Sequence, residues 1–189
     1  MNYSGIFLLI AALAFPLWCA IAYNRFVAMR NRCVNARSQV DVELKMRHDV
    51  VPRLAELVRG YAAHEKRTLE SLALTRAAAV RADSIHERIA SENALSSSIS
   101  SLFAVAEGYP ELRADDNFLR LQDELAALED RIRFSRQFYN DTVMRYNTLI
   151  NLFPNSLAAG MLRFREEPFF EFESGIRGET ARPDERPPR

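Results

Sequence analysis

The sequence predicts an all-α protein: an N-terminal transmembrane helix followed by an antiparallel bundle of about four helices, two long and two shorter. Three observations support this fold class. Residues 1–24 carry no charged side chain, whereas the rest of the chain is rich in charge. After that segment, apolar residues recur at steps of three and four, which is the periodicity of an amphipathic helix. No stretch alternates like a strand, and the breaks between periodic stretches are short enough for antiparallel packing.

Residues 1–24 are long and apolar enough to form a membrane anchor. A hydrocarbon core of about 30 Å is spanned by roughly 20 helical residues, and residues 4–23 meet that length. No Lys or Arg precedes the segment. Four arginines follow it, namely Arg25, Arg30, Arg32 and Arg37. Under the positive-inside rule, a single pass through the inner (cytoplasmic) membrane then leaves the short N-terminus outside and the bundle in the cytoplasm.

A cleaved secretory signal is the alternative for this segment. Ala20-Ile21-Ala22 has the small-x-small pattern of a cleavage site. However, the segment lacks the positive charge that begins a signal peptide, and its apolar run is long for such a signal. These two departures favour an anchor that is retained.

The rest of the chain divides into a helical bundle at residues 25–172 and a polar, proline-rich tail at residues 173–189, which is predicted to be disordered. The first bundle helix is expected to continue directly from the anchor to Tyr61. Pro52 lies inside it and is expected to kink the helix or to leave local carbonyls unpaired.

Three further helices are expected in the bundle. The second begins near residues 64–66, and the third follows an N-cap at Ser91, with residues 82–93 open between helix and loop. The fourth begins at residues 115–116 and carries a heptad seam as far as Phe153, just before a proline.

Composition and motif spacing argue against several functional classes. The formal net charge is +0, so the chain is by default a poor nucleic-acid binder, because affinity for a duplex needs a cationic surface. The two cysteines, Cys19 and Cys33, offer no disulfide framework. A di-metal site in a bundle needs Glu-x-x-His on two helices, and no histidine here has Glu three positions before it. The sequence therefore predicts a non-enzymatic protein with no cofactor and no metal.

Nine side chains are candidates for a partner surface or a polar network: Arg47, His48, Asp49, Tyr61, His64, Arg136, Tyr139, Asn140 and Asp141. Arg47 interrupts the apolar stripe of the first bundle helix. A salt bridge from this region to Glu124 or Asp123 on the fourth helix, fixing the register, is favoured over a partner-facing network.

The other candidates also have two interpretations. Tyr61 and His64, together with Glu65, are expected to cap a helix–helix turn rather than to form a pH-sensitive site. The stretch 136–141 is either a core seam or a partner surface, and these alternatives stay open. The aromatic cluster at residues 164–172 either touches the membrane or another protein, or packs back onto the bundle.

Several short stretches together carry a family resemblance. They include Lys45-Met46-Arg47-His48-Asp49-Val50-Val51-Pro52 and lie at residues 23–24, 30–32, 34–36, 38–42, 45–52, 60–65, 106–110, 117–118, 121–122, 136–140, 146–147, 153–154 and 169–170. On these stretches the chain resembles the LemA family of bacterial membrane-anchored helical-bundle proteins. One departure is Ala36-Arg37, where the family commonly has Ala-Trp.

The resemblance implies a single-pass anchor with a cytoplasmic bundle and supplies no catalytic residue or cofactor. It also implies a link to envelope stress or membrane protein quality control through a membrane zinc metalloprotease. The expected function is a scaffold or adaptor that contacts the bilayer through residues 1–24 and binds a membrane or cytoplasmic protein, with a homo-oligomer as an open possibility. The alternative is a signal-relay module that couples the membrane helix to the bundle, with Arg47 and Pro52 as weak points.

Overall fold

The computed structural model describes residues 3–170, without the side chains of residues 3–13 and of Phe15. These residues form six helices and no β-strand, which confirms the all-α class. The helices are α1 (Tyr3–Tyr61), α2 (Lys66–Arg81), α3 (Ile85–Ala106), α4 (Pro110–Arg113), α5 (Asp116–Asn151) and α6 (Asn155–Met161). The tail predicted to be disordered, residues 173–189, lies outside the described residues, as does Phe172.

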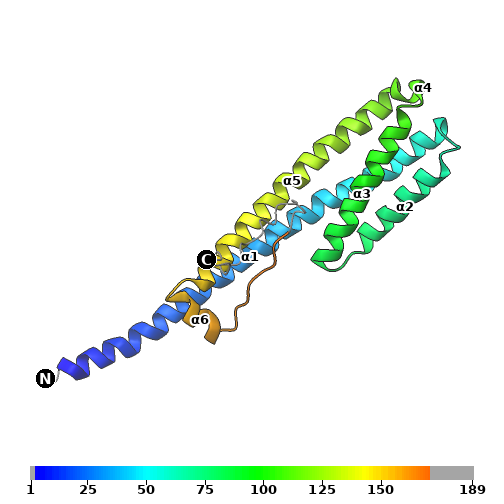
Figure 1. The fold of residues 1–189 in the computed structure, drawn as a ribbon. Helices are drawn as coiled ribbons and strands as arrows, with labels where there is room; N and C mark the ends of the chain where they lie inside the picture. The colour runs from blue at the N-terminus through cyan, green and yellow to red at the C-terminus, as the bar shows by residue number, and fades with distance from the viewer. Residues whose placement is uncertain (1–2, 171–189) are drawn as a thin grey trace, which may run out of the picture.

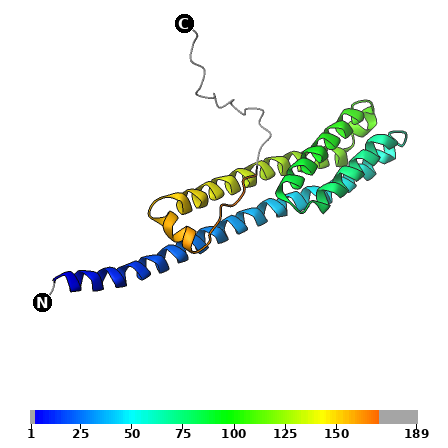
Figure 2. The ribbon, with the colours of Figure 1, turned by 60° about the horizontal axis from the view of Figure 1, so that its bottom comes forward.

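Two long antiparallel helices, α1 and α5, form the axis of the molecule (Figure 1). The α2–α3 hairpin covers the half of this pair that includes the end of α1 and the start of α5 (Figures 1 and 2). At the opposite half, α6 and the extended segment after it lie along the pair, and the first turns of α1 project beyond the bundle (Figure 2). We call residues 162–170 the C-terminal strap.

The predicted anchor, residues 1–24, falls largely on positions whose side chains are outside the described set. Among the residues that were described, no helix is both long and apolar enough to cross a lipid bilayer. The backbone of α1 is helical without a break from Tyr3, so the expected continuity between the apolar segment and the first bundle helix is present.

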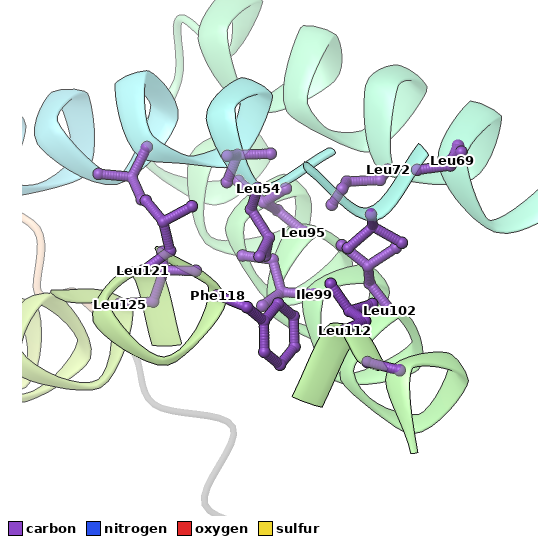
Figure 3. Close-up of a cluster of buried hydrophobic side chains, with 14 of the residues drawn as sticks. Leu54, Leu69, Leu72, Leu95, Ile99, Leu102, Leu112, Phe118, Leu121 and Leu125 are labelled. Carbon is purple, nitrogen blue, oxygen red and sulfur yellow. The ribbon is translucent and has the colours of Figure 1, made fainter. Parts of the chain in front are cut away.

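The half of the molecule that carries α2 and α3 is held by a core to which α1, α2, α3, α4 and α5 contribute (Figure 3). Leu54 of α1, Leu72 of α2 and Leu102 of α3 are fully buried in it, and Phe118 and Leu125 enter from α5. This burial follows from the stripe of apolar residues at steps of three and four on each helix, which gives each one a single face to cover.

The other half has a second core, in which α6 and the strap take the place of a helix pair. Phe26 and Val40 of α1 pack with Tyr139 and Tyr146 of α5, and Phe170 of the strap closes the cluster. A short helix and an extended segment therefore bury the apolar faces of α1 and α5 where no second hairpin is present.

The third predicted helix begins earlier than expected. It starts at Ile85, not after Ser91, and its N-cap is Ser84. The Ser84 hydroxyl accepts a hydrogen bond from the Glu87 backbone N–H at 3.1 Å, while the Glu87 carboxylate accepts from the Ser84 N–H at 3.3 Å. This reciprocal capping box satisfies two of the N–H groups left free at a helix start, so the polar residues after Ser84 are helical.

The fourth predicted helix is shorter than its seam suggested. As α5, it ends at Asn151, and the Phe153 side chain is 81% exposed in the turn before α6. Residues 155–161, which carried no predicted element, form α6. The heptad spacing included Phe153 because periodicity alone does not distinguish the last turn of a helix from the turn that follows it.

Candidate functional site

A buried ionic network lies at the junction of the two cores. Arg47 of α1 and Glu92 of α3 form an ion pair in which each side chain is only 1% exposed. A second nitrogen of the Arg47 guanidinium donates to Glu129 of α5 at 2.5 Å and to the Ser96 hydroxyl at 2.9 Å. The network thus joins three helices through one arginine, whose planar fork of donors suits two carboxylates at once.

His48 bonds the second oxygen of the Glu92 carboxylate. Its Nε2 lies 2.8 Å from Glu92 Oε1, and because an ionised carboxylate only accepts hydrogen bonds, the imidazole nitrogen donates. Burial raises the pKa of Glu92, but the hydrogen bond from His48 and the charge of Arg47 outweigh it, so the pKa lies below its ordinary value. Glu92 is therefore held as a carboxylate inside the bundle.

The predicted salt bridge of the Arg47 region exists, but its partners differ from those expected. Arg47 reaches Glu129, not Glu124 or Asp123, and its fully buried partner Glu92 lies on α3. Glu124 instead pairs at 3.4 Å with Arg53, on the exposed side of α1. The sequence did not reveal Glu92 because its segment was left open between helix and loop, so no face could be assigned to it.

Pro52 lies inside α1 and leaves one carbonyl of the helix without its usual donor. Proline has no N–H, so the carbonyl of His48, four residues earlier, loses its helical hydrogen bond. The Arg76 Nε of α2 donates to this oxygen at 2.7 Å. The unpaired carbonyl expected from the sequence is therefore satisfied by a neighbouring helix, and α1 continues through Pro52 to Tyr61.

A hollow of about 390 Å³ opens beside this part of the network. Asp41, Lys45 and Asp49 line it from α1, and Arg76 and Arg88 line it from α2 and α3. Arg88 forms an ion pair with Asp41 across the opening. With Glu92, three acidic and three basic side chains line the hollow, so it has no surplus of either charge to select a ligand.

The second polar arrangement fastens the strap to α5. The Asn140 amide pairs both ways with the backbone of Phe170: its Nδ2 donates to the carbonyl at 2.9 Å, and its Oδ1 accepts from the N–H at 2.8 Å. Asn147 does the same with the backbone of Glu167, at 2.9 and 3.0 Å. Two asparagine side chains therefore act as a strand-like edge for an extended segment.

Two tyrosines, each one position before one of these asparagines, also bond to the backbone of the strap. The Tyr139 hydroxyl donates to the carbonyl of Pro168 at 2.7 Å, and the Tyr146 hydroxyl donates to that of Arg165 at 3.0 Å. Seven helical residues rise about 10.5 Å. Three extended residues advance about 10 Å. The two spacings match, so each Tyr-Asn pair meets an equivalent point on the strap.

The sequence contains a signal for this arrangement that was not used. The dipeptide Tyr-Asn occurs twice on the same helix face, at residues 139–140 and 146–147. Two amides at a seven-residue spacing on one face predict an extended segment with a three-residue repeat alongside. The apolar periodicity of the helix does not indicate these two asparagines, because their side chains are polar.

Arg136 contacts the strap and lies within the electrostatic influence of the ionic network. Its guanidinium lies 5.1 Å from the centre of the Phe170 ring. Burial and the charge of Arg47 lower the pKa of Arg136, while Glu92 and Glu129 act in the opposite direction. Of the aromatic cluster predicted either to contact the membrane or to fold back, Phe164 and Phe170 pack on the bundle, and Phe169 is exposed.

The model of the LemA family matches residues 36–183, which is well over half of the chain. The chain belongs to the LemA family. Because the match includes α2 to α6 and most of the bundle part of α1, both the ionic network and the strap lie within the LemA-family region.

Three curated proteins are similar to this LemA-family chain at low identity. Magnetosome protein MamQ 1 and magnetosome protein MamQ 2 of Paramagnetospirillum magneticum are each 23% identical to it, over 86% of this chain and 69% of their own length. Magnetosome protein MamQ of Magnetospirillum gryphiswaldense is 22% identical, over 85% of this chain and 69% of its own length.

The remaining predicted site residues of this LemA-family chain are dispersed. Tyr61 donates a hydrogen bond at 2.9 Å to Asp115, the N-cap of α5, at the far end of the bundle. This bond raises the pKa of Tyr61 and lowers the pKa of Asp115. His64, Asp49 and Asp141 are exposed, and the structure therefore does not gather the nine candidates into one site.

The chemistry that these groups support is structural. Within the described residues, no group of three or more His, Cys, Asp or Glu side chains is placed to hold a metal ion. Arg47 and His48 hold both oxygens of the buried Glu92 carboxylate, whereas Glu129 pairs with Arg47 at the edge of the network and its side chain is 48% exposed. Arg47 and the two Tyr-Asn pairs instead fix how three helices and an extended segment pack.

Proposed function

We propose that this LemA-family protein is a non-enzymatic, single-pass scaffold of the inner membrane, anchored by residues 1–24 and binding a protein partner with its cytoplasmic bundle. The observation that carries the proposal is the continuity of α1, which joins the uncharged N-terminal segment to the bundle without a hinge loop. A rigid connection of this kind holds a bundle at a defined height and angle on the bilayer.

Further observations support the membrane placement. Leu17 and Ile21, at the end of the apolar segment, are 64% and 60% exposed, although Ala22 beside them is buried in the second core. Exposed apolar side chains in a row are costly in water and favourable in lipid. The relatives are named for the magnetosome and not for a reaction, which favours a structural role here also.

The exposed face of α5 is the surface that best fits a protein partner. Phe134 and Phe138 are 62% and 55% exposed and lie one helical turn apart, with Asp141 exposed on the next turn. Aromatic side chains that are exposed together on a folded surface are typical of interaction sites. Phe138 and Asp141 belong to the stretch 136–141, for which the sequence allowed either a core seam or a partner surface. Phe134 lies just before that stretch.

Membrane placement is tested by carbonate extraction of the full chain from cell membranes. The wild type is expected in the membrane pellet, whereas Leu9→Arg with Leu13→Arg is expected in the extract, because each charge at a bilayer centre costs about 2.5–3.5 kcal/mol on insertion scales. The matched control is Leu74→Arg with Val80→Arg on the bundle surface. Recovery of the wild type in the extract would remove the anchor from the proposal.

The scaffold role is tested by photocrosslinking in intact cells with the probe on α5 at position 137. A defined crosslinked protein is expected with the wild type and is expected to be lost with Phe134→Ser and Phe138→Ser. A membrane zinc metalloprotease, the partner class that the family resemblance implies, is one identity that mass spectrometry of the product would reveal. A crosslinking pattern unchanged by both substitutions would count against this surface.

The alternative, a signal relay with Arg47 and Pro52 as weak points, has less support. Arg47 is bonded to two other helices and the carbonyl freed by Pro52 is paired with Arg76. Both features brace α1 at these positions. A scaffold needs such bracing, whereas a relay needs an element with two arrangements of similar free energy.

A further inference from the structure

A groove of about 530 Å³ lies between α1 and α5 just beyond the predicted anchor. Its floor is apolar and consists of Met29, Met144, Leu149 and Leu152. Arg25, Arg32 and Arg145 stand around it, two from α1 and one from α5. No Asp or Glu lines the groove, and among the described residues none of these three arginines forms an ion pair with a carboxylate.

The helix geometry sets the height of this groove above the anchor. If α1 leaves the hydrocarbon at Tyr23, a rise of 1.5 Å per residue places Arg25 about 3 Å and Arg32 about 13 Å farther along the helix. The headgroup layer on each side of a bilayer is about 5–8 Å thick. The arginines of the groove therefore bracket the level at which lipid phosphates lie.

The neighbouring turn between α5 and α6 presents apolar side chains at the same end of the bundle. Leu152 and Phe153 are exposed in the turn, and Leu157 and Met161 are exposed on α6 just after it. The turn is held against α1 because Phe164, just after α6, packs edge-on against the rings of Tyr23 and Phe26 at 5.9 and 5.2 Å. Exposed Phe, Leu and Met side chains at this height suit the boundary between headgroups and acyl chains.

We propose that the groove binds an anionic phospholipid from the leaflet that faces the bundle, with the phosphate between Arg25, Arg32 and Arg145 and the upper acyl chain on the methionine and leucine floor. This inference rests on the membrane anchor of the proposed function. A guanidinium offers paired donors that match phosphate oxygens, and anionic lipids concentrate at the cytoplasmic surface.

The apolar floor and the three arginines of the groove together select an anionic phospholipid over other anions. Free phosphate or a soluble phosphate ester would use the arginines but would leave the exposed floor side chains of Met144 and Leu152 in water. A nucleic acid needs a cationic track and does not suit an apolar floor. A zwitterionic lipid covers the floor, but its own cation competes with the arginines for its phosphate. An anionic lipid satisfies both parts.

The test is native mass spectrometry of the full chain, purified in a neutral detergent and titrated with dioleoylphosphatidylglycerol or dioleoylphosphatidylcholine. The wild type is expected to retain the anionic lipid at least about tenfold more strongly, because each basic residue near an anionic surface changes binding about fivefold. Arg25→Gln with Arg32→Gln and Arg145→Gln is expected to abolish this preference. The matched control removes three exposed arginines elsewhere, through Arg81→Gln with Arg113→Gln and Arg120→Gln.

A second variant keeps every side chain that forms the floor and the arginine rim. Thr148 lies in the groove and is exposed, so Thr148→Glu adds a carboxylate among the arginines without opening the core. It is expected to lower phosphatidylglycerol retention about as strongly as loss of one arginine. Circular dichroism melting of both variants establishes that they are folded.

The outcomes separate this inference from the proposed function. Equal retention of the two lipids by the wild type, or a preference that survives in both groove variants, would overturn the lipid site. Competition by glycerol 3-phosphate as effective as that by the lipid would assign the groove to a soluble phosphate and also overturn it. In each case carbonate extraction reports the anchor separately, and a wild type that is extracted overturns both proposals.

Discussion

Arg47 and Glu92 form an ion pair that bulk water does not reach, although they lie on different helices and each side chain is only 1% exposed. Removal of Glu92 breaks this buried pair and leaves Arg47 with Glu129, whose side chain is 48% exposed, as its remaining carboxylate partner. Breaking a buried pair costs about 3–5 kcal/mol. We expect Glu92→Ala to lower the free energy of unfolding by about that amount. Urea unfolding of the full chain in detergent, followed by circular dichroism, measures it.

Two further variants test whether the loss of stability in Glu92→Ala comes from the burial of the charges. Arg53→Ala breaks the exposed pair with Glu124 and is expected to cost less than about 1 kcal/mol. The double change Arg47→Met with Glu92→Leu removes both charges and is expected to recover most of the lost stability, since apolar replacements of a buried pair are often neutral. A double variant as unstable as Glu92→Ala would show that the pair itself contributes most of the stability.

Stability should depend on Glu92 in acid. The pKa of Glu92 is lower in the folded chain than its ordinary value of 4.5, because His48 and Arg47 outweigh the effect of burial. Below the ordinary value the unfolded chain therefore binds more protons, and stability falls as the pH falls toward the folded pKa. The contribution is fully present above about pH 5. We expect Glu92→Gln to flatten this acid limb of the urea midpoint, measured from pH 7 to pH 3.

The exposed substitution Glu70→Gln serves as the control for this acid limb. It removes one carboxyl group from α2 without touching the ionic network. An acid limb that Glu70→Gln flattens as much as Glu92→Gln would contradict the assignment to Glu92.

Arg76 and Pro52 should be energetically coupled through the carbonyl of His48. Arg76→Ala leaves that carbonyl without its donor and is expected to cost about 1 kcal/mol. In a Pro52→Ala background the restored backbone N–H pairs with the same oxygen, so loss of Arg76 should cost less. A double-mutant cycle from urea unfolding measures the difference, and a coupling free energy near zero would refute the role of Arg76.

The extent to which sequence predicts this molecule depends on the kind of signal. The apolar stripes of α1 and α5 extend over many turns, so the existence of these two long helices was predicted correctly. A single polar residue in a stripe indicates that Arg47 needs a partner, but the choice among several acidic residues is set by how three helices pack. The strap was missed because an extended segment has no periodicity of its own and is ordered by side chains on another element.

The start of α3 shows the same limit and leads to a paired prediction. Ser84 and Ser91 both precede helical residues, but only Ser84 caps the helix. We expect Ser84→Ala to lower the free energy of unfolding by about 1 kcal/mol. Ser91 donates its hydroxyl to the carbonyl of Glu87 within the helix, so Ser91→Ala is expected to be neutral or slightly stabilising. If urea unfolding gave the reverse order, the helix would begin where the sequence first suggested.

The strap should open locally when its asparagine partners are removed. Asn140→Ala breaks both hydrogen bonds to Phe170, and Asn147→Ala breaks both to Glu167. Each loss leaves backbone groups unpaired at a cost of about 1–3 kcal/mol, which exceeds what one ring contact restores. Hydrogen exchange of the Phe170 amide is expected to accelerate about tenfold or more in Asn140→Ala, while α5 amides near the ionic network stay protected.

The asparagine substitutions also report whether the strap opens as one unit. The two anchor points are only three residues apart on an extended segment, so Asn147→Ala should accelerate exchange at Phe170 as well as at Glu167. Asn151→Ala removes only a side-chain bond to Glu166 and serves as the control, with little change expected at either amide. Acceleration confined to the amide next to each substitution would instead mean that the strap is held at independent points, with the Phe170 ring against Tyr139 sufficient to keep its end in place.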